Sequence, residues 1–117
     1  MLSNRITVAL AANTYRFATE DELQRGIAAA LTNAEIPFER EVRLGLPDRI
    51  DFLCGDVGIE VKIGGGISAL TRQLSRYADS ERIAALVVVT SRNQHRVQLP
   101  RRINDKPIAV VVVGGIA

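Results

Sequence analysis

The spacing of apolar residues predicts one helix and then three strands in the first half of the chain. The apolar residues that recur at the four-residue steps of a helix face are Leu23, Ile27 and Leu31. Thr19 and Glu22 have the spacing of a capping box, which predicts that this helix extends over 19–33. Strands are predicted after it over 38–46, 49–54 and 57–63.

The second half of the chain predicts another helix and two apolar strands. Ser68 is placed as an N-cap, so a helix is expected over 68–79, after a run of three glycines. The continuous apolar run 83–91 is typical of a strand that is covered on both faces, and 107–115 predicts the last strand. The element order therefore predicts an α/β sandwich with a mixed sheet.

Two segments carry weaker signals. Residues 1–17 have no clean period, so no element is predicted there. The basic segment 92–102 is predicted as a loop between the two apolar strands, and its histidine, His95, is expected to be solvated.

The composition predicts a single domain over residues 1–117. The chain has 117 residues, of which 47% are hydrophobic, and this is enough to bury a core. No stretch reaches the roughly 18 apolar residues of a membrane span, and 6–12 is too short for a secretion signal. The single cysteine, Cys54, excludes an internal disulfide framework, so we expect a buried thiol and a cytoplasmic location. The net charge of +2 is small, so binding to nucleic acid would depend on local clusters of Arg.

The segment 50–62 predicts a hairpin in which two carboxylates face each other. A Gly-Asp turn at 55–56 suits a type II′ geometry, and pairing the residues beside it places Asp51 opposite Glu60. The full predicted register is Cys54 with Val57, Phe52 with Ile59, Asp51 with Glu60, Ile50 with Val61, and Arg49 with Lys62. Opposed like charges on paired strands are unfavourable, so a compensating group is expected.

This register separates an apolar face of the hairpin from a charged one. The apolar face is predicted to hold Ile50, Phe52, Cys54, Val57, Ile59, Val61 and Ile63. The charged face is predicted to hold Arg49, Asp51, Glu60 and Lys62, beside Leu53 and Gly58. A solvated surface, in which the carboxylates pair with the cations, is one interpretation of this face.

The other interpretation is a metal site for phosphodiester hydrolysis. In this register the Cβ atoms of Asp51 and Glu60 lie about 5 Å apart, near enough for both carboxylates to bind one ion. Mg²⁺ or Mn²⁺ suits such a site, because both prefer oxygen ligands. Lys62 lies on the same face as Glu60, where its charge would favour a nucleophilic hydroxide or offset the charge that develops on a phosphate.

These residues resemble the PD-(D/E)XK nuclease superfamily, in which an acidic residue on one strand precedes Glu-Val-Lys on the next. The core of that superfamily, namely helix, three strands, helix and strand, is similar to the predicted order over 19–91. The resemblance implies a restriction-endonuclease-like core and a Mg²⁺-dependent deoxyribonuclease. It implies that Asp51, Glu60 and the carbonyl of Val61 bind the metal, and that Lys62 is the catalytic lysine. Asp48, which follows a proline, competes with Asp51, which is preferred because it shares the face and register of Glu60.

The first helix offers a further acidic residue, as in Holliday-junction resolvases and exonuclease-like members that the chain resembles. Glu22 is already explained by the capping box, whereas Glu20 shares the face of Leu23 and points toward the sheet. Glu20 is therefore the preferred catalytic candidate.

The second helix carries Gln73 and, one turn later, Tyr77, as several branches of the superfamily do. Gln73 is predicted to orient a water or to touch the scissile phosphate. Arg72 and Arg76, together with Tyr77, are predicted to contact nucleic acid.

Two rival functions follow from the same residues. The first is a DNA endonuclease, for which branched DNA is one candidate substrate. It is expected as a homodimer, because so short a chain offers little surface to hold its substrate. The alternative is a non-catalytic DNA-binding or assembly module on the same fold. An RNA-directed nuclease would carry the same motif.

Overall fold

A computed structural model describes residues 1–45 and 47–114 of the chain. Ten elements follow one another: α1 (Leu2–Ala11), α2 (Glu20–Asn33), β1 (Glu39–Arg43), β2 (Arg49–Cys54), β3 (Val57–Lys62), α3 (Ile67–Ala78), β4 (Ala85–Thr90), α4 (Asn93–Gln98), β5 (Arg102–Ile103) and β6 (Lys106–Val112). They form a compact α/β globule, with a radius of gyration of 12.9 Å.

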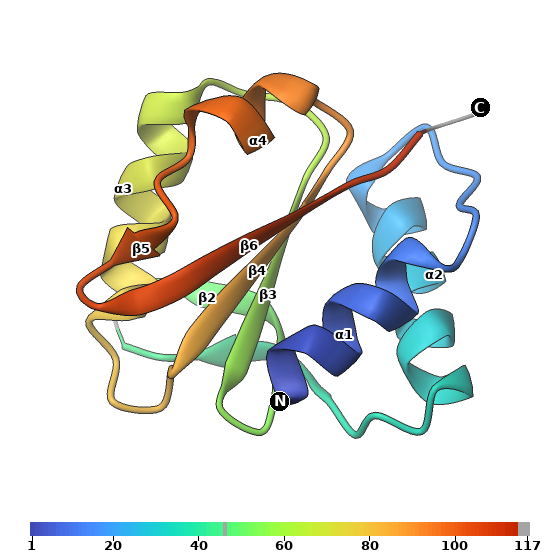
Figure 1. Cartoon of the computed structure of the whole chain (residues 1–117), viewed down its shortest axis with the longest axis horizontal. Coiled ribbons are helices and arrows are strands. Elements are labelled where there is room, and N and C mark those ends of the chain that lie inside the picture. The colour runs from blue at the N-terminus through green and yellow to red at the C-terminus, as the bar shows by residue number, and fades with distance from the viewer. Residues whose placement is uncertain (46, 115–117) are drawn as a thin grey trace.

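The strands form one mixed sheet of six, in the order β1-β2-β3-β4-β6-β5. The pairs β1–β2 and β2–β3 are antiparallel, whereas β3, β4 and β6 run parallel. The connection from β3 to β4 contains α3, as parallel neighbours require. Helices α1 and α2 lie on one side of the sheet, and α3 lies on the other (Figure 1).

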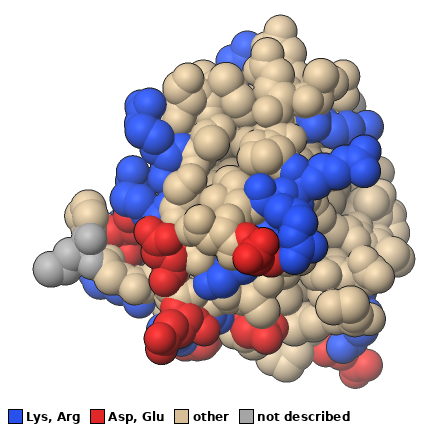
Figure 2. Space-filling view, turned by 60° about the vertical axis from the view of Figure 1, so that its left-hand side comes forward, with Lys and Arg blue, Asp and Glu red and all other residues tan. Residues whose placement is uncertain are grey.

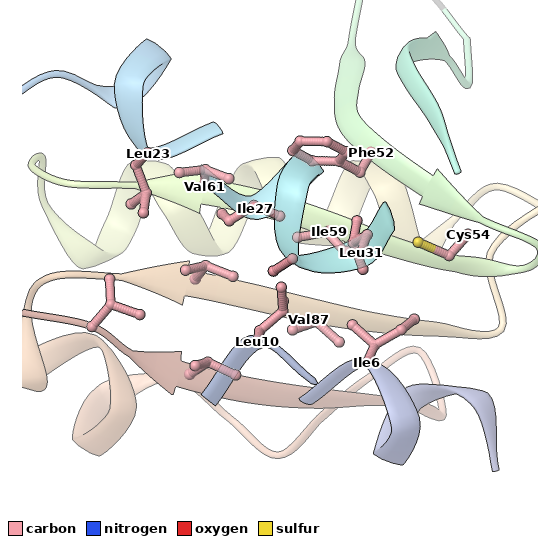
Figure 3. Close-up of a cluster of buried hydrophobic side chains, with 14 of the residues drawn as sticks. Ile6, Leu10, Leu23, Ile27, Leu31, Phe52, Cys54, Ile59, Val61 and Val87 are labelled. Atoms are coloured by element: carbon pink, nitrogen blue, oxygen red, sulfur yellow. The ribbon is translucent and has the colours of Figure 1, made fainter. Parts of the chain in front are cut away.

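Each side of the sheet has its own apolar core. The first core joins α1 and α2 to β2, β3 and β4 through residues such as Leu10, Ile27, Phe52 and Val87 (Figure 3). The second packs Leu70, Leu74 and Tyr77 of α3 on Leu53, Leu86 and Val88 of the sheet. All six residues of β4 are buried, which confirms the predicted strand with two covered faces.

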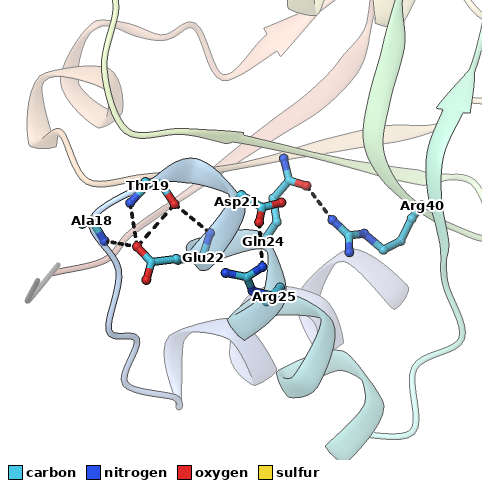
Figure 4. A network of polar contacts seen from close by, with 7 residues as sticks. All are labelled: Ala18, Thr19, Asp21, Glu22, Gln24, Arg25 and Arg40. Carbon is cyan, nitrogen blue, oxygen red and sulfur yellow. Dashed lines mark hydrogen bonds and ion pairs between the residues drawn. The ribbon is translucent and has the colours of Figure 1, made fainter.

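The local signals in the sequence were reliable where a cap or a turn defined them. Helix α2 begins after Thr19, and both halves of the capping box are present (Figure 4). The hairpin turn is also as predicted: Gly55 has a φ of +59°, which the first position of a type II′ turn requires.

Three local predictions need correction. Helix α3 begins after Gly66, which lacks a side-chain cap, so Ser68 is inside the helix and not its cap. Residues 2–11, for which no element was predicted, form α1 and bury Ile6 and Leu10. Part of the predicted loop 92–102 forms α4.

The predicted division of the hairpin into two faces is wrong at one residue. Ile50 packs in the α3 core, whereas Phe52 packs in the α1–α2 core. Asp51 lies between these two residues, and Glu41 of β1 lies opposite it. Glu41 has a φ of +53°, so the β1–β2 pair is distorted at this point. Strict alternation therefore fails at Asp51.

No helix in the described ranges, 1–45 and 47–114, is long and apolar enough to cross a membrane.

Candidate functional site

The hairpin β2–β3 opens at Asp51, and this opening forms the site. The ladder pairs Cys54 with Val57 and Phe52 with Ile59, as predicted. Among the described residues, no ladder pair joins β2 to β3 beyond Phe52–Ile59, so the predicted pairing of Asp51 with Glu60 is not part of the ladder. The side chain of Asp51 bridges the strands instead, because its Oδ2 accepts a hydrogen bond of 2.8 Å from Val61 N–H.

The remaining outer pairs of the prediction are also absent from the ladder in this part of the chain. Neither Ile50 with Val61 nor Arg49 with Lys62 is paired. From Glu60 onward β3 is held by β4, which pairs with it in parallel as far as Lys62 and Thr90. The strand that carries Glu60 and Lys62 is thus fixed by its buried neighbour on the other side.

Glu60 is a buried carboxylate with an unsatisfied oxygen. The residue is only 3% exposed, and its Oε1 has no hydrogen-bond partner. Burial, and after it the nearby charge of Asp51, raises the pKa of Glu60 to about 8. A buried ionised carboxylate with an oxygen that accepts no hydrogen bond is costly, so the site favours either a proton or a cation at this position.

Asp51 is half-buried beside Glu60. Burial raises the pKa of Asp51, and the hydrogen bond from Val61 N–H opposes part of this shift. The negative charge of Glu20 also raises the pKa of Asp51, and the charge of Asp51 raises the pKa of Glu60. Ionisation of one acid at this site therefore makes ionisation of its neighbour harder.

Lys62 supplies the nearest positive charge. Its Nζ lies 3.8 Å from Oε2 of Glu60, and its side chain is 28% exposed. The lysine therefore faces Glu60 on one side and solvent on the other, which agrees with the predicted placement of both on one face.

Glu20 approaches the end of β3 from helix α2. Its Oε2 accepts a hydrogen bond of 3.4 Å from Ile63 N–H. Glu22, by contrast, accepts from Ala18 N–H and Thr19 N–H in the capping box, away from the sheet (Figure 4). The structure brings Glu20 toward the site, as predicted, and leaves Glu22 at the helix terminus.

Gln73 and Tyr77 reach the site from α3 and are linked. Gln73 Nε2 donates to the Tyr77 hydroxyl at 3.0 Å, and that hydroxyl donates to the Arg49 carbonyl at 2.8 Å. Tyr77 is fully buried, so it has no surface for the nucleic-acid contact that the sequence predicted. Its position fits a residue that fixes Gln73 and the start of β2.

Asp48 is not brought to Glu60. Its Oδ2 accepts a hydrogen bond of 2.6 Å from Arg76 Nε, so this carboxylate forms an ion pair with α3. Arg76 is thereby partly neutralised, whereas Arg72, one turn earlier, is exposed. The preference for Asp51 over Asp48 agrees with this geometry.

A pocket of about 240 Å³ opens beside Lys62. Its lining comprises Lys62, Gly64, Gly65, Gly66, Ala69, Leu70, Gln73 and Arg76. We call it the Lys62 pocket. It joins the lysine, the glutamine and the triple glycine around one hollow at the C-terminal end of β3.

His95 is a residue that sequence reasoning misplaced. It was expected in a solvated loop, yet it is 2% exposed in α4. Its Nδ1 lies 2.7 Å from Thr90 Oγ1, and its Nε2 lies 3.3 Å from the Gly65 carbonyl. The polar composition of the segment gave no sign of this burial, because the Gly65 carbonyl comes from 30 residues away along the chain.

Within residues 1–45 and 47–114, no three side chains of His, Cys, Asp or Glu are grouped to hold an ion. The set available is therefore the two carboxylates of Asp51 and Glu60 with main-chain oxygen, and Glu20 does not complete a group of three. All of these are the hard oxygen ligands that Mg²⁺ and Mn²⁺ accept together with water.

No family model matches the chain, and neither a curated protein nor a solved structure matches it. The function must accordingly be inferred from the site.

Proposed function

We propose that the chain is a metal-dependent DNA endonuclease of the PD-(D/E)XK type, with a restriction-endonuclease-like core. The observation that carries this proposal is the buried Oε1 of Glu60, which lacks a partner beside a second half-buried carboxylate. The order α2, β1, β2, β3, α3, β4 supports it, because it follows the helix and strand order of that superfamily.

The energetics of the carboxylate pair favour a cation. Burying an ion without compensation costs several kcal/mol, and the single ammonium of Lys62 stands 3.8 Å from one oxygen of Glu60. A divalent ion held by Asp51, Glu60 and the carbonyl of Val61 would satisfy the orphan oxygen and cancel the repulsion. When bound, such an ion supplies a water of lowered pKa as the nucleophile.

The chain's own residues then have separate tasks. Lys62 faces the pocket and places a positive charge where the phosphate gains negative charge. Gln73, fixed by Tyr77, presents an amide to the same pocket and would position the attacking water or a phosphate oxygen. Glu20 holds the end of β3 through Ile63 and so positions Lys62.

A cleavage assay tests the proposal. Purified protein is incubated with four-way-junction, duplex and single-stranded DNA, and with RNA, in Mg²⁺ or in EDTA. We expect Mg²⁺-dependent cleavage of DNA that falls at least about 100-fold in Glu60→Gln and in Lys62→Ala. Glu81→Gln, which changes an exposed carboxylate, and Lys106→Ala are the matched controls and should cleave normally.

The outcomes separate the rival functions. Cleavage that survives both site substitutions means that the site is misassigned. Binding of DNA without cleavage in any metal favours the alternative, a DNA-binding or assembly module. Mn²⁺ titration by calorimetry gives an independent measure, in which binding should disappear in Asp51→Asn.

A further inference from the structure

A second hollow lies along the outer side of α3. We call it the α3–α4 groove, and its lining comprises Ile67, Ser68, Thr71, Arg72, Ser75, Arg76 and Gln98. Its volume is about 690 Å³, compared with 240 Å³ for the Lys62 pocket. The six lining residues from α3 recur at helical spacing on one face, and Gln98 of α4 forms the opposite wall.

The groove is chemically suited to an extended anion. Its lining has two guanidinium groups, three hydroxyl groups and one amide, and none of its residues is acidic. Asp and Glu side chains on this side of the molecule gather below, and Lys and Arg side chains spread above and among them (Figure 2). The net charge of the whole chain is only +2, so the absence of carboxylates from the groove is a local feature.

The groove and the Lys62 pocket have one lining residue in common. Arg76 borders both hollows, so a strand that lies along the groove would reach the pocket at this residue. The ion pair of Arg76 with Asp48 holds the guanidinium at this junction. Arg72 adds an exposed cation one helical turn away.

We propose that the α3–α4 groove binds the sugar-phosphate backbone of the nucleic-acid strand whose scissile phosphate enters the Lys62 pocket. Arg72 neutralises a phosphate, and Arg76, whose charge is shared with Asp48, donates to a neighbouring phosphate. The hydroxyls of Ser68 and Ser75 with the amide of Gln98 contact phosphate oxygens. Contacts of this kind position a strand without reading its bases, so the groove sets affinity and direction but no sequence preference. We call this course of the strand, along the groove and into the Lys62 pocket, the path. It rests on the proposed function.

Binding measured without catalysis tests this path. Fluorescence anisotropy of a labelled oligonucleotide is recorded in EDTA, so that cleavage cannot contribute, over a series of salt concentrations. Ser75→Glu, which places a negative charge in the groove, should weaken binding at least about tenfold. Arg72→Ala should weaken it by about fivefold and lower the slope of log affinity against log salt by about one.

The controls place the same charge changes on the far side of the sheet. Ala29→Glu changes an exposed position of α2, and Arg5→Ala removes an exposed cation from α1. Both should leave the affinity within about twofold, because exposed charges farther apart than a Debye length are largely screened. Circular dichroism confirms that all four variants are folded.

Failure of the path and failure of the nuclease proposal give different results. Metal-dependent cleavage with unchanged binding in Ser75→Glu and Arg72→Ala overturns the path and leaves the nuclease. Loss of binding in those variants without any cleavage supports backbone binding in the groove alone and rejects the nuclease. A polyglutamate peptide that competes as well as DNA would overturn the assignment to phosphate backbone, and so would absence of DNA binding.

Discussion

At the scale of single residues, the burial of Glu60 has a measurable consequence for stability. Its pKa is raised in the folded protein to about 8, whereas a glutamate in an unfolded chain titrates near 4.3. The folded protein therefore keeps a proton that the unfolded chain releases between these two pH values. Stability from this group is present at low pH and is lost as the pH rises through about 8.

We therefore predict that the free energy of unfolding of the metal-free protein falls as the pH rises from about 5 to about 8. The loss is of the order of several kcal/mol, at roughly 1.4 kcal/mol for each unit of raised pKa. Asp51 adds to it in the same direction, because its pKa is also raised by burial. Urea denaturation in EDTA at a series of pH values measures the slope.

The neutral isostere Glu60→Gln should remove most of this slope, and Glu81→Gln, at an exposed carboxylate, should keep it. Equal slopes in the two variants would mean that Glu60 does not carry the effect.

The motif residues could be chosen from the sequence, since Glu60 and Lys62 alternate along one strand. The burial of Glu60 could not, because it depends on β4 and on Tyr77 from a distant helix.

At the scale of elements, α4 is a helix that the local sequence does not predict. Helix α2 was predictable because its capping box lies within four consecutive residues. Helix α4 has only six residues, all but one of them polar, and it is held by contacts with residues far along the chain. Its one buried residue, His95, joins the end of β4 to the triple glycine that lines the Lys62 pocket.

The contacts of His95 show which ring nitrogen donates and which accepts. The Gly65 carbonyl can only accept, so Nε2 carries the hydrogen and donates to it. Nδ1 then accepts from the Thr90 hydroxyl, whose oxygen in turn accepts from Arg92 N–H. Each of these hydrogen-bonding groups therefore has a partner.

We predict that ¹⁵N NMR finds a hydrogen on Nε2 of His95, donated to the Gly65 carbonyl. His95→Ala should lower the free energy of unfolding by about 1–3 kcal/mol, because it leaves the Thr90 hydroxyl and the Gly65 carbonyl without this partner. Amide exchange in residues 64–66 should also accelerate. Val97→Ala changes an exposed residue of α4 and should alter neither measurement; a similar response in both variants would contradict the assigned contacts.

At the scale of the whole molecule, the sheet must fit between two helical layers, and Gly58 lies where the core on the α3 side leaves no room for a side chain. A Cβ at this position would meet Ile50 Cδ1, and would lie 3.0 Å from both Ile83 Cδ1 and Leu86 Cδ2. These three side chains come from both strands that flank β3 and from the segment before β4. The packing of Ile50 over Gly58 is also what places it in the α3 core, contrary to the alternation expected from the sequence.

We predict that Gly58→Ala lowers the free energy of unfolding by about 1–3 kcal/mol, because an added methyl group overpacks this core. Gly64→Ala is the matched control: an added Cβ there meets nothing within 4 Å, so its effect should be small. Thermal denaturation followed by circular dichroism compares the two, and equal midpoints would contradict the close packing.

Because Gly58 precedes Glu60 by one full period of β3, the displacement of Ile50 should also disturb the opening at Asp51. Mn²⁺ affinity should accordingly fall in Gly58→Ala at temperatures where the variant is fully folded.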